Sequence, residues 1–161
     1  MIEFVPMSET EFDAYLAIAI PDYAEENVKA GNWAPGEAEE KARSSYKELL
    51  PDGVSTANNH IFTVVDSESR SKVGMIWFVV KMRPSGGSAF LCDFRIDEAH
   101  RRKGYGRQTL LHFEEALRKR GITRNALHVF GGNVAARSLY ESLGYIITNI
   151  HMAKELDGHR G

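Results

Sequence analysis

The stretch Arg101-Arg102-Lys103-Gly104-Tyr105-Gly106-Arg107 joins a hydrophobic run, residues 89–96 (AFLCDFRI), to a helical pattern over residues 108–120. A strand, a short basic loop and a helix start in this order build an anion site, because free backbone N–H groups at a helix N-terminus carry partial positive charge. Gly104 and Gly106 have no Cβ that would keep a phosphate away from these donors. The three consecutive cations add long-range attraction for a polyanion. The stretch therefore predicts a pyrophosphate site.

Other interpretations of this loop stay open from the local sequence. Two glycines can serve a purely structural turn, and Arg-Arg-Lys can form a solvated turn or a nucleic-acid patch. The loop lacks the Gly-Lys-Ser/Thr ending of a Walker A motif, and Thr109 stands where the third glycine of Gly-x-Gly-x-x-Gly would be. The anion site therefore needs support from further along the chain.

Composition bounds the class of protein. The chain has 161 residues, of which 43% are hydrophobic and 26% charged, with a formal net charge of −2. These values predict one globular domain over residues 1–161 and disfavour a nucleic-acid partner, which would select a strongly basic surface. The sequence shows no signal pattern and no apolar run of membrane-spanning length, so we expect a cytoplasmic protein without a membrane partner. The histidines show no metal-ligand spacing, and no metal is expected.

Periodicity and breakers predict an α+β fold with a mixed sheet. Ser8 and Glu11 form a capping box that opens a helix, which Pro21 should interrupt or kink and Gly31 should end. Further helices are predicted from Pro35 or Glu37 to Leu50 and over residues 108–120 and 133–143. Strands are predicted over residues 2–5, 60–65, 73–81, 89–96, 126–130 and 145–156.

A second informative segment covers residues 127–145 (LHVFGGNVAARSLYESLGY). Asn133 is an apt helix N-cap, and Ala136, Leu139 and Tyr140 lie on one face of the helix that follows. Arg101-x-x-Gly104-x-Gly106 followed by Asn133-x-x-Ala136-x-x-Leu139-Tyr140-x-x-x-Gly144-Tyr145 resembles the GCN5-related N-acetyltransferase (GNAT) superfamily, in particular small bacterial members of unassigned substrate.

The resemblance implies a mixed, mostly antiparallel central sheet with helices on both faces. Residues 1–60 then supply the first strand and the acceptor-side helices, and residues 89–156 the acetyl-CoA-binding core. The main chain of Phe94 and Ile96 would pair with the pantetheine arm, and Tyr140 would protonate the departing thiolate. The residues expected to contact acetyl-CoA are Phe94, Arg95, Ile96, Arg101, Arg102, Lys103, Gly104, Tyr105, Gly106, Arg107, Asn133, Ala136 and Tyr140.

The catalytic base has two candidates. His128 lies five residues before Asn133, where N-terminal-acetylating relatives look to carry a Glu, and an unperturbed imidazole pKa of about 6.5 suits proton removal near neutral pH. His128 can equally be a structural residue. Asp93 can hold the substrate ammonium, relay a proton through water, or form a salt bridge. Cys92 has no adjacent cation and is not expected to act as a nucleophile.

We therefore expect an acetyl-CoA-dependent N-acetyltransferase that acts directly on a primary amine of a small molecule or polyamine. A protein N-terminus or lysine is the alternative acceptor, and a non-catalytic acyl-CoA sensor is the alternative from another class. Tyr23, Trp33, Glu25 and Glu26 can line the acceptor pocket, although solvated-face acidity explains the glutamates equally well. An exposed edge strand near the C-terminus can support a homodimer.

Overall fold

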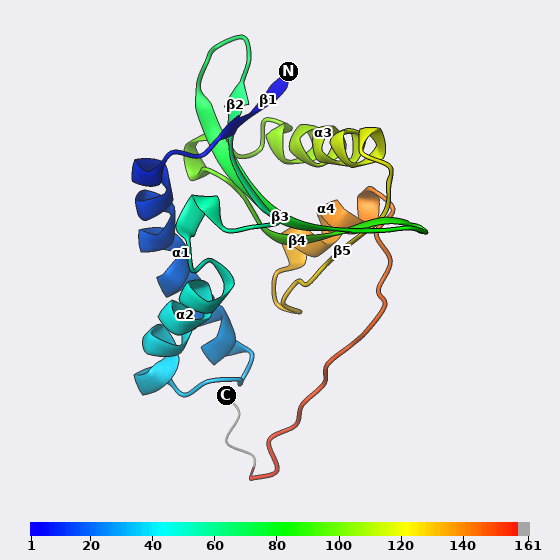
Figure 1. Cartoon of the computed structure of the whole chain (residues 1–161). Coiled ribbons are helices and arrows are strands. Elements are labelled where there is room, and N and C mark those ends of the chain that lie inside the picture. Colours follow the sequence, from blue (N-terminus) through cyan, green and yellow to red (C-terminus); the bar gives the residue numbers. More distant parts are fainter. Residues whose placement is uncertain (158–161) are drawn as a thin grey trace.

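A five-stranded sheet with its strands in chain order forms the centre of the structure (Figure 1). The computed structural model describes residues 1–157. The strands are β1 (Ile2–Pro6), β2 (Asn59–Asp66), β3 (Lys72–Arg83), β4 (Gly86–Ile96) and β5 (Ile122–Leu127). Neighbouring strands from β1 to β4 are antiparallel, whereas β5 is parallel to β4. The expected mixed, mostly antiparallel sheet is confirmed.

Helices cover both faces of this sheet, as expected. They are α1 (Glu9–Lys29), α2 (Pro35–Leu49), α3 (Tyr105–Lys119) and α4 (Val134–Ser142). On one face, α1 and α2 bury side chains of β2 and β3 that include Ile61, Met75 and Trp77. On the opposite face, α3 packs Leu110, Phe113 and Leu117 against the alternate side chains of the same strands (Figure 1). The period-2 alternation of β3 thus supplies two hydrophobic cores.

The start of α1 follows its sequence signal. Ser8 accepts a hydrogen bond from the Glu11 N–H, and the Glu11 carboxylate accepts one from the Ser8 N–H, both at 3.1 Å. The expected interruption at Pro21 does not occur, since α1 runs from Glu9 to Lys29. Buried residues on both sides of Pro21, among them Tyr15 and Ala24, hold the helix on the core despite the missing N–H.

Two strand predictions near the C-terminus are wrong. The strand expected over residues 126–130 is β5, which begins at Ile122 and ends at Leu127. The strand pairs with residues 87–91 of β4. Its middle residues, Thr-Arg-Asn, are polar, so the sequence pattern does not indicate a strand there. Residues 145–156 form no strand in the described part of the chain, because no neighbouring strand pairs with them. In addition, α3 begins at Tyr105, three residues before the expected start at Gln108.

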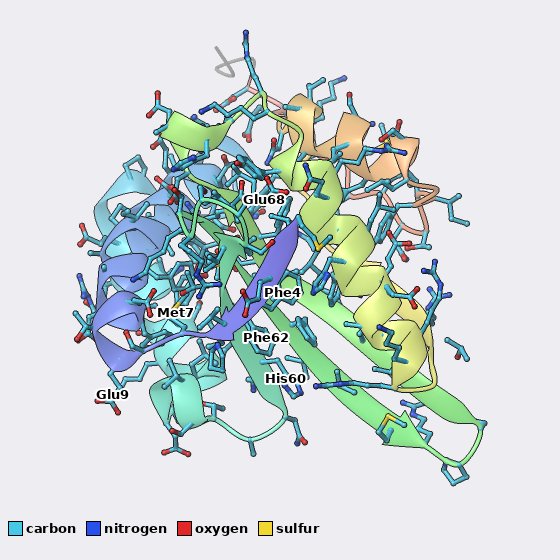
Figure 2. The ribbon with its side chains drawn as sticks, turned by 90° about the horizontal axis from the view of Figure 1, so that it is seen from above. Phe4, Met7, Glu9, His60, Phe62 and Glu68 are labelled. Carbon is cyan, nitrogen blue, oxygen red and sulfur yellow. The ribbon has the colours of Figure 1, made fainter. Side chains whose placement is uncertain are left out.

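Aromatic side chains of β1 and β2 line the sheet face that carries α3. Figure 2 labels Phe4, Phe62 and His60 along this row. Phe4 stacks on Phe62 with ring centroids 5.7 Å apart, and its edge meets His112 of α3 at 4.6 Å. The row extends the core under α3 toward the first strand.

Candidate functional site

The strands β4 and β5 part in the middle of β4. Their parallel pairing ends at the pair Leu91–Leu127, whereas β4 continues to Ile96 beside β3. The β3–β4 register shifts here, because Trp77 faces Asp93 and Phe78 faces Leu91, which leaves Cys92 as an extra residue. A bulge of this kind bends the strand and re-aims its side chains. Within residues 1–157, the segment 92–96 therefore pairs with a strand on one side only, and we call it the open part of β4.

The basic loop lies between this open strand and α3. Gly104 precedes the first helical residue with φ +83°, a left-handed conformation that favours glycine, and no side chain caps the helix. The first hydrogen bond of α3 is donated by the Gln108 N–H to the Gly104 carbonyl. The N–H groups of the preceding helical residues 105–107 have no carbonyl one turn earlier in the helix to bond. The helix start thus presents backbone donors that suit an anion.

The side chains of the loop take different directions. Arg101, Arg102 and Lys103 are exposed. Arg101 donates from Nε to the Ile96 carbonyl at 2.9 Å, so its side chain ties the loop to the end of β4. Tyr105 donates to Asp66 Oδ2 at 2.6 Å and anchors the helix start to the β2–β3 turn. Tyr105 can therefore contribute only its backbone N–H to an anion site, because its hydroxyl is engaged with Asp66.

Gly106 allows the three predicted motifs to meet. A Cβ at this position would lie 3.3 Å from Leu139 of α4, 3.6 Å from Phe94 and 3.9 Å from Ile96 of β4. The absence of a side chain lets α3, α4 and the open part of β4 approach one another. Arg107, one residue further, lies 3.4 Å from the Ser142 hydroxyl at the end of α4.

Helix α4 carries the second motif. Asn133 caps it, as expected, by accepting a hydrogen bond from the Ala136 N–H at 3.3 Å. Tyr140 is half-buried, and its ring lies 5.6 Å from that of Tyr145. Burial, assisted by the negative charge of Asp93, raises the pKa of the Tyr140 phenol to about 12. The phenol is therefore a proton donor throughout the neutral range.

Asp93 is the centre of a polar network that joins β4 to α1. Its Oδ2 accepts from the Tyr15 hydroxyl at 2.5 Å and from Arg95 Nε at 3.1 Å, and its Oδ1 accepts from the Phe94 N–H at 2.8 Å. Arg95 also pairs with Asp22 of α1 at 2.6 Å. Burial opposes the charge of Arg95, but the two carboxylates hold its pKa above the ordinary value. Of this network, only Asp93 and Arg95 are among the site residues expected from the sequence.

His128 and Cys92 have different surroundings. His128 lies just beyond β5, is exposed, and meets the Phe130 ring edge-on at 4.9 Å. The Phe130 ring centroid in turn lies 6.3 Å from that of Tyr23, so the segment after β5 contacts α1. Burial, with Asp93 as a second cause, raises the pKa of the Cys92 thiol to about 12, which keeps it protonated and a poor nucleophile.

Comparison with protein families matches residues 22–145 to the acetyltransferase (GNAT) family. The chain belongs to this family. The match covers both motifs and the open strand, and it confirms the resemblance that the sequence indicated. The protein is thus an acetyltransferase, and its α+β fold is that of the family.

Two relatives align with almost the whole acetyltransferase. An uncharacterized N-acetyltransferase from Bacillus subtilis, YycN, is 37% identical over 96% of this chain and 99% of its own length. A second from the same organism, YdgE, is 34% identical over 93% of this chain and 95% of its own. The crystal structure of YycN superimposes with a TM-score of 0.91 over 97% of this chain and 99% of that one. A ribosomal protein bS18-alanine N-acetyltransferase from Escherichia coli is 42% identical over 57 residues, 35% of this chain and 38% of its own.

The expected site residues of the acetyltransferase fall into three groups. Phe94, Arg95 and Ile96 lie on the open part of β4, residues 101–107 form the uncapped helix start, and Asn133, Ala136 and Tyr140 lie on α4. The close approach at Gly106 joins these groups. His128 contacts Phe130, whose ring lies near Tyr23 of α1, and no contact joins it to these groups within residues 1–157. Tyr15 and Asp22 were missed, because nothing local distinguishes two residues of an amphipathic helix from ordinary core and surface positions.

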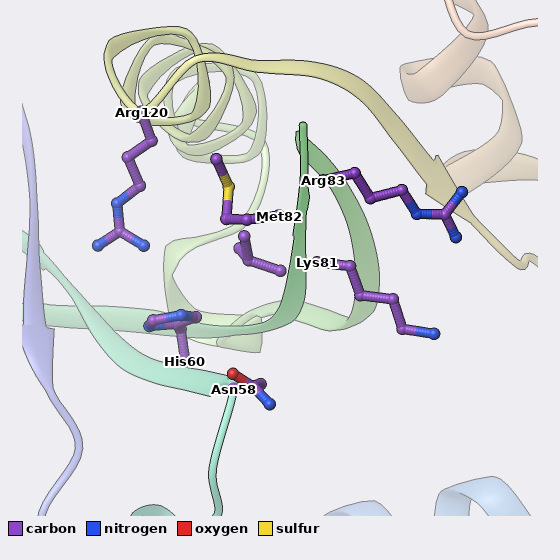
Figure 3. A pocket seen from close by; sticks show the side chains of 7 residues that line it. Asn58, His60, Lys81, Met82, Arg83 and Arg120 are labelled. Atoms are coloured by element: carbon purple, nitrogen blue, oxygen red, sulfur yellow. The ribbon is translucent and has the colours of Figure 1, made fainter. Parts of the chain in front are cut away.

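A cavity of about 840 Å³ lies elsewhere on the acetyltransferase (Figure 3). Its walls come from β2, β3 and the end of α3, and include His60, Met82 and Arg120. None of the expected site residues lines it. Among residues 1–157 we find no group of three potential metal-ligand side chains and no helix long and apolar enough to cross a membrane.

Proposed function

We propose that this acetyltransferase uses acetyl-CoA as donor and transfers the acetyl group directly to a primary amine of a small molecule or polyamine. The observation that carries the proposal is the parting of β4 and β5 between the uncapped start of α3 and Tyr140. An open strand edge can pair with the amide groups of a pantetheine arm, and a helix start can hold a pyrophosphate. The donor set on this chain therefore fits acetyl-CoA.

The proposed roles follow from the chemistry of the residues present. The main chain of Phe94 and Ile96 aligns the arm, the amides of residues 101–106 hold the pyrophosphate, and Asn133 binds the cofactor near α4. Tyr140 gives its phenolic proton to the sulfur when the C–S bond breaks, and a pKa of about 12 keeps that proton in place beforehand. The bond that forms joins the amine nitrogen to the acetyl carbon, and the proton lost by the amine goes to a base or to water.

For the base, the structure supports a division of roles between the two candidates. Asp93 accepts hydrogen bonds from the Tyr15 hydroxyl, Arg95 Nε and the Phe94 N–H, which hold its carboxylate in a fixed position beside the open part of β4. His128 is exposed just beyond the end of β5. We propose that Asp93 positions the amine and that His128, directly or through water, receives the proton.

The acceptor side is aromatic as well as acidic. Tyr23 lies 5.5 Å from Trp33 and 6.3 Å from Phe130, with both rings tilted or perpendicular to its own. Asp22 follows Pro21 on the same helix and pairs with Arg95. Aromatic faces beside carboxylates attract cationic amines. Glu25 is exposed and pairs with Lys29 at 3.0 Å, which favours its role as a solvated surface residue.

A second acceptor class has one observation in its favour. The relative that matches 57 residues of this chain is named for the alanine N-terminus of a ribosomal protein. A protein N-terminus is therefore the alternative acceptor. The non-catalytic sensor is disfavoured by the half-buried, protonated Tyr140, since binding alone requires no acid at the sulfur.

The test is acetyl-CoA turnover, measured as free thiol released, against polyamines, amino acids, aminoglycosides and N-terminal peptides. Wild type and Tyr140→Phe are compared, with Tyr145→Phe as a matched control for loss of a neighbouring hydroxyl. We expect turnover with a small amine, reduced by about 10²-fold or more in Tyr140→Phe with unchanged CoA affinity.

The outcomes separate the alternatives. Turnover with peptides alone would replace the small-amine acceptor by a protein N-terminus. Tight CoA binding without any turnover in wild type would favour the sensor. Equal turnover in wild type and Tyr140→Phe would remove Tyr140 from the proposed acid role.

A further inference from the structure

Two cavities share Arg120, the residue that follows α3. The larger, of about 840 Å³, is also lined by Asn58, His60 and residues 80–83 of β3. The smaller, of about 210 Å³, lies between the aromatic row of β1 and β2 and the last turns of α3. We call the two cavities together the α3 groove. Within residues 1–157, neither cavity is lined by the open part of β4, by the start of α3 or by α4, so the groove is separate from the candidate functional site.

The end of β3 leaves the groove open on one side. The pairing of β2 with β3 ends at Asn59 and Val79, and just beyond it the Val80 N–H donates to the Asn58 carbonyl at 3.3 Å. β3 continues to Arg83, and in the described part of the chain this extension pairs only with β4. The larger cavity lies where β2 no longer accompanies β3, and it is accessible from solvent.

Arg120 brings a positive charge to both cavities without a carboxylate to neutralise it. Other helical cations pair with an acidic side chain one turn away, as Lys29 does with Glu25 and Arg118 with Glu114. The residue one turn before Arg120 is Ala116, which itself lines the smaller cavity. Within residues 1–157, Arg120 forms no ion pair, and no aspartate or glutamate lines either cavity. The guanidinium is therefore available to an external anion.

His60 faces this guanidinium. Figure 3 shows the Arg120 side chain extending from the end of α3 toward the imidazole, whereas Lys81 and Arg83 extend from the other side of β3. Burial, followed by the positive charge of Arg120, lowers the pKa of His60 below its ordinary value. The imidazole is therefore neutral at neutral pH and keeps one N–H donor. A single negative group between the two side chains can accept hydrogen bonds from both.

Aromatic rings line the rest of the groove. His60 stacks with Phe78 at a centroid distance of 5.1 Å and lies nearly parallel to Phe62, with 9° between the ring planes. Phe62 continues the row to Phe4 at 5.7 Å. The row ends at His60 in the larger cavity, because the preceding lining residue, Asn58, is not aromatic. A flat ring placed against this end would extend the row, and offset stacking of aromatic rings is favourable.

We propose that the α3 groove binds a small aromatic carboxylate, with its carboxylate between Arg120 and His60 and its ring against the aromatic row. A carboxylate matches the planar guanidinium and carries the one negative charge that Arg120 can neutralise. A phosphorylated ligand such as a nucleotide fits less well, because Lys81 and Arg83 extend from the other side of β3 and leave one cation in front of the anion. The site is independent of the proposed acetyl-CoA site at the other end of α3.

The first experiment locates a probe, naphthoate, by amide NMR spectra of the isotope-labelled full chain. We expect saturable chemical-shift changes in residues 58–62, 78–83 and 112–120, and the same dissociation constant with and without excess CoA. The absence of saturable changes would overturn the proposal. Changes in residues 92–107 that CoA abolishes would also overturn it, because the probe then occupies the proposed pyrophosphate site. A chain that fails to bind CoA would contradict the proposed function alone, since the spectra locate naphthoate without it.

Two relatives of the probe separate its charge from its ring. Naphthamide keeps the ring system and has no charge, so we expect its dissociation constant to be at least about tenfold higher than that of naphthoate. Decahydronaphthoate keeps the carboxylate and has saturated rings, so we expect its dissociation constant to be several-fold higher. Equal binding of naphthamide and naphthoate would refute the anion site, and equal binding of decahydronaphthoate would refute the role of the aromatic row.

A matched pair of substitutions tests the residue that receives the carboxylate. Arg120→Gln removes the charge from the groove, and Arg124→Gln removes the same charge from an exposed residue of β5 that lines neither cavity. We expect the naphthoate dissociation constant to rise at least about tenfold in Arg120→Gln and to stay within about twofold in Arg124→Gln. Circular dichroism verifies that both variants fold. Equal naphthoate affinity in the two folded variants would refute Arg120 as the anion-binding residue of the groove.

Discussion

The Tyr15 hydroxyl donates a 2.5 Å hydrogen bond to Asp93 Oδ2 and so ties α1 to the bulge of β4. The two residues are separated by 78 positions in the sequence. Burial, together with the Asp93 carboxylate, raises the pKa of Tyr15 well above its ordinary value, so the phenol remains a donor. This contact fixes α1 relative to the open part of β4, and it positions the carboxylate that we propose for amine binding.

Tyr15→Phe removes the donor while preserving the ring. Since hydrogen bonds to charged groups contribute about 1.5–3 kcal/mol, we expect the free energy of unfolding to fall by about that amount in urea denaturation. Tyr23→Phe is the control, because its hydroxyl makes no hydrogen bond within residues 1–157, while its ring packs in the same cluster. A loss of the same size in both variants would mean that the Tyr15–Asp93 bond adds nothing specific.

The Glu11 carboxylate makes the free energy of unfolding depend on pH in the acidic range. Burial disfavours its charge, but hydrogen bonds from the Ser8 N–H, the Lys72 ammonium and the Thr63 hydroxyl outweigh it and lower the pKa from 4.5 to about 2. A carboxylate with a lowered folded pKa stabilises the protein above pH 4.5, and this contribution is lost as the pH falls from 4.5 toward 2. After allowance for solvent screening, we expect about 1–2 kcal/mol.

The measurement is urea unfolding of wild type, Glu11→Gln and Glu9→Gln at pH values from 7 down to 3. Glu9 is exposed in the same helical turn and serves as the control. The gap between wild type and Glu11→Gln should narrow on acidification, whereas that between wild type and Glu9→Gln should stay small. A gap that is constant with pH would show that the Glu11 charge is not what stabilises the helix start.

Two glycines predict opposite effects of the same substitution. A Cβ at Gly74 of β3 would lie 2.0 Å from the Arg95 carbonyl oxygen, so the strand pair must separate. A Cβ at Gly36 of α2 meets nothing within 4 Å. We expect Gly74→Ala to lower the free energy of unfolding by more than about 3 kcal/mol, and Gly36→Ala to raise it by about 0.5–1 kcal/mol. Thermal unfolding of both variants tests these two expectations. An unchanged free energy of unfolding in Gly74→Ala would contradict the close approach of β3 and β4.

The helix start depends on the backbone of Gly104. Its φ of +83° is left-handed, and the nearest atom to an added Cβ, Gln108 Nε2, lies 3.8 Å away. Gly104→Ala therefore meets backbone strain without a clash, and we expect a loss of about 1–2 kcal/mol in stability. Gly104→Asn should lose less, since asparagine tolerates this conformation and can cap the helix.

Isothermal titration of the same two variants with CoA extends this prediction to the proposed anion site. Distortion of the loop should weaken CoA binding more in Gly104→Ala than in Gly104→Asn. If both variants bind CoA like wild type, the pyrophosphate is held elsewhere.

Tyr140 predicts a late alkaline titration. Burial, and then the charge of Asp93, raises its pKa from 10.0 to about 12, so folding favours the neutral phenol. A raised folded pKa stabilises the protein below pH 10, and this contribution is lost as the pH rises toward 12. The difference in tyrosinate absorbance between wild type and Tyr140→Phe should therefore appear only above about pH 11. If the absorbance difference titrates near pH 10, the Tyr140 phenol is exposed to solvent and its pKa is not raised by folding.

Local sequence was sufficient for most of the elements. The Ser8–Glu11 capping box, the alternation of β3 and the glycines around residues 104–106 each act within a few residues, so their structural consequences can be derived from the sequence. The order of the two motifs, residues 101–106 and 133–145, also indicated the family, and the family match over residues 22–145 covers both. Phe94, the helix start and Tyr140 lie on the strand and helices predicted for them, and their roles stay predictions.

Tertiary structure decided what depends on a partner distant in sequence. α1 continues through Pro21 because the core on both sides compensates for a lost hydrogen bond. The polar residues 123–125 form part of β5 because they pair with the main chain of β4. Residues 145–156 have the pattern of a strand and form none, since a strand requires a neighbour as well as a sequence. Tyr15 and Asp22 join Asp93 and Arg95 only when α1 crosses the bulge of β4. The sequence by itself determined the local conformations and the chemistry that residues can supply; the tertiary structure decided which of them meet, because hydrogen bonds and burial depend on distance in space.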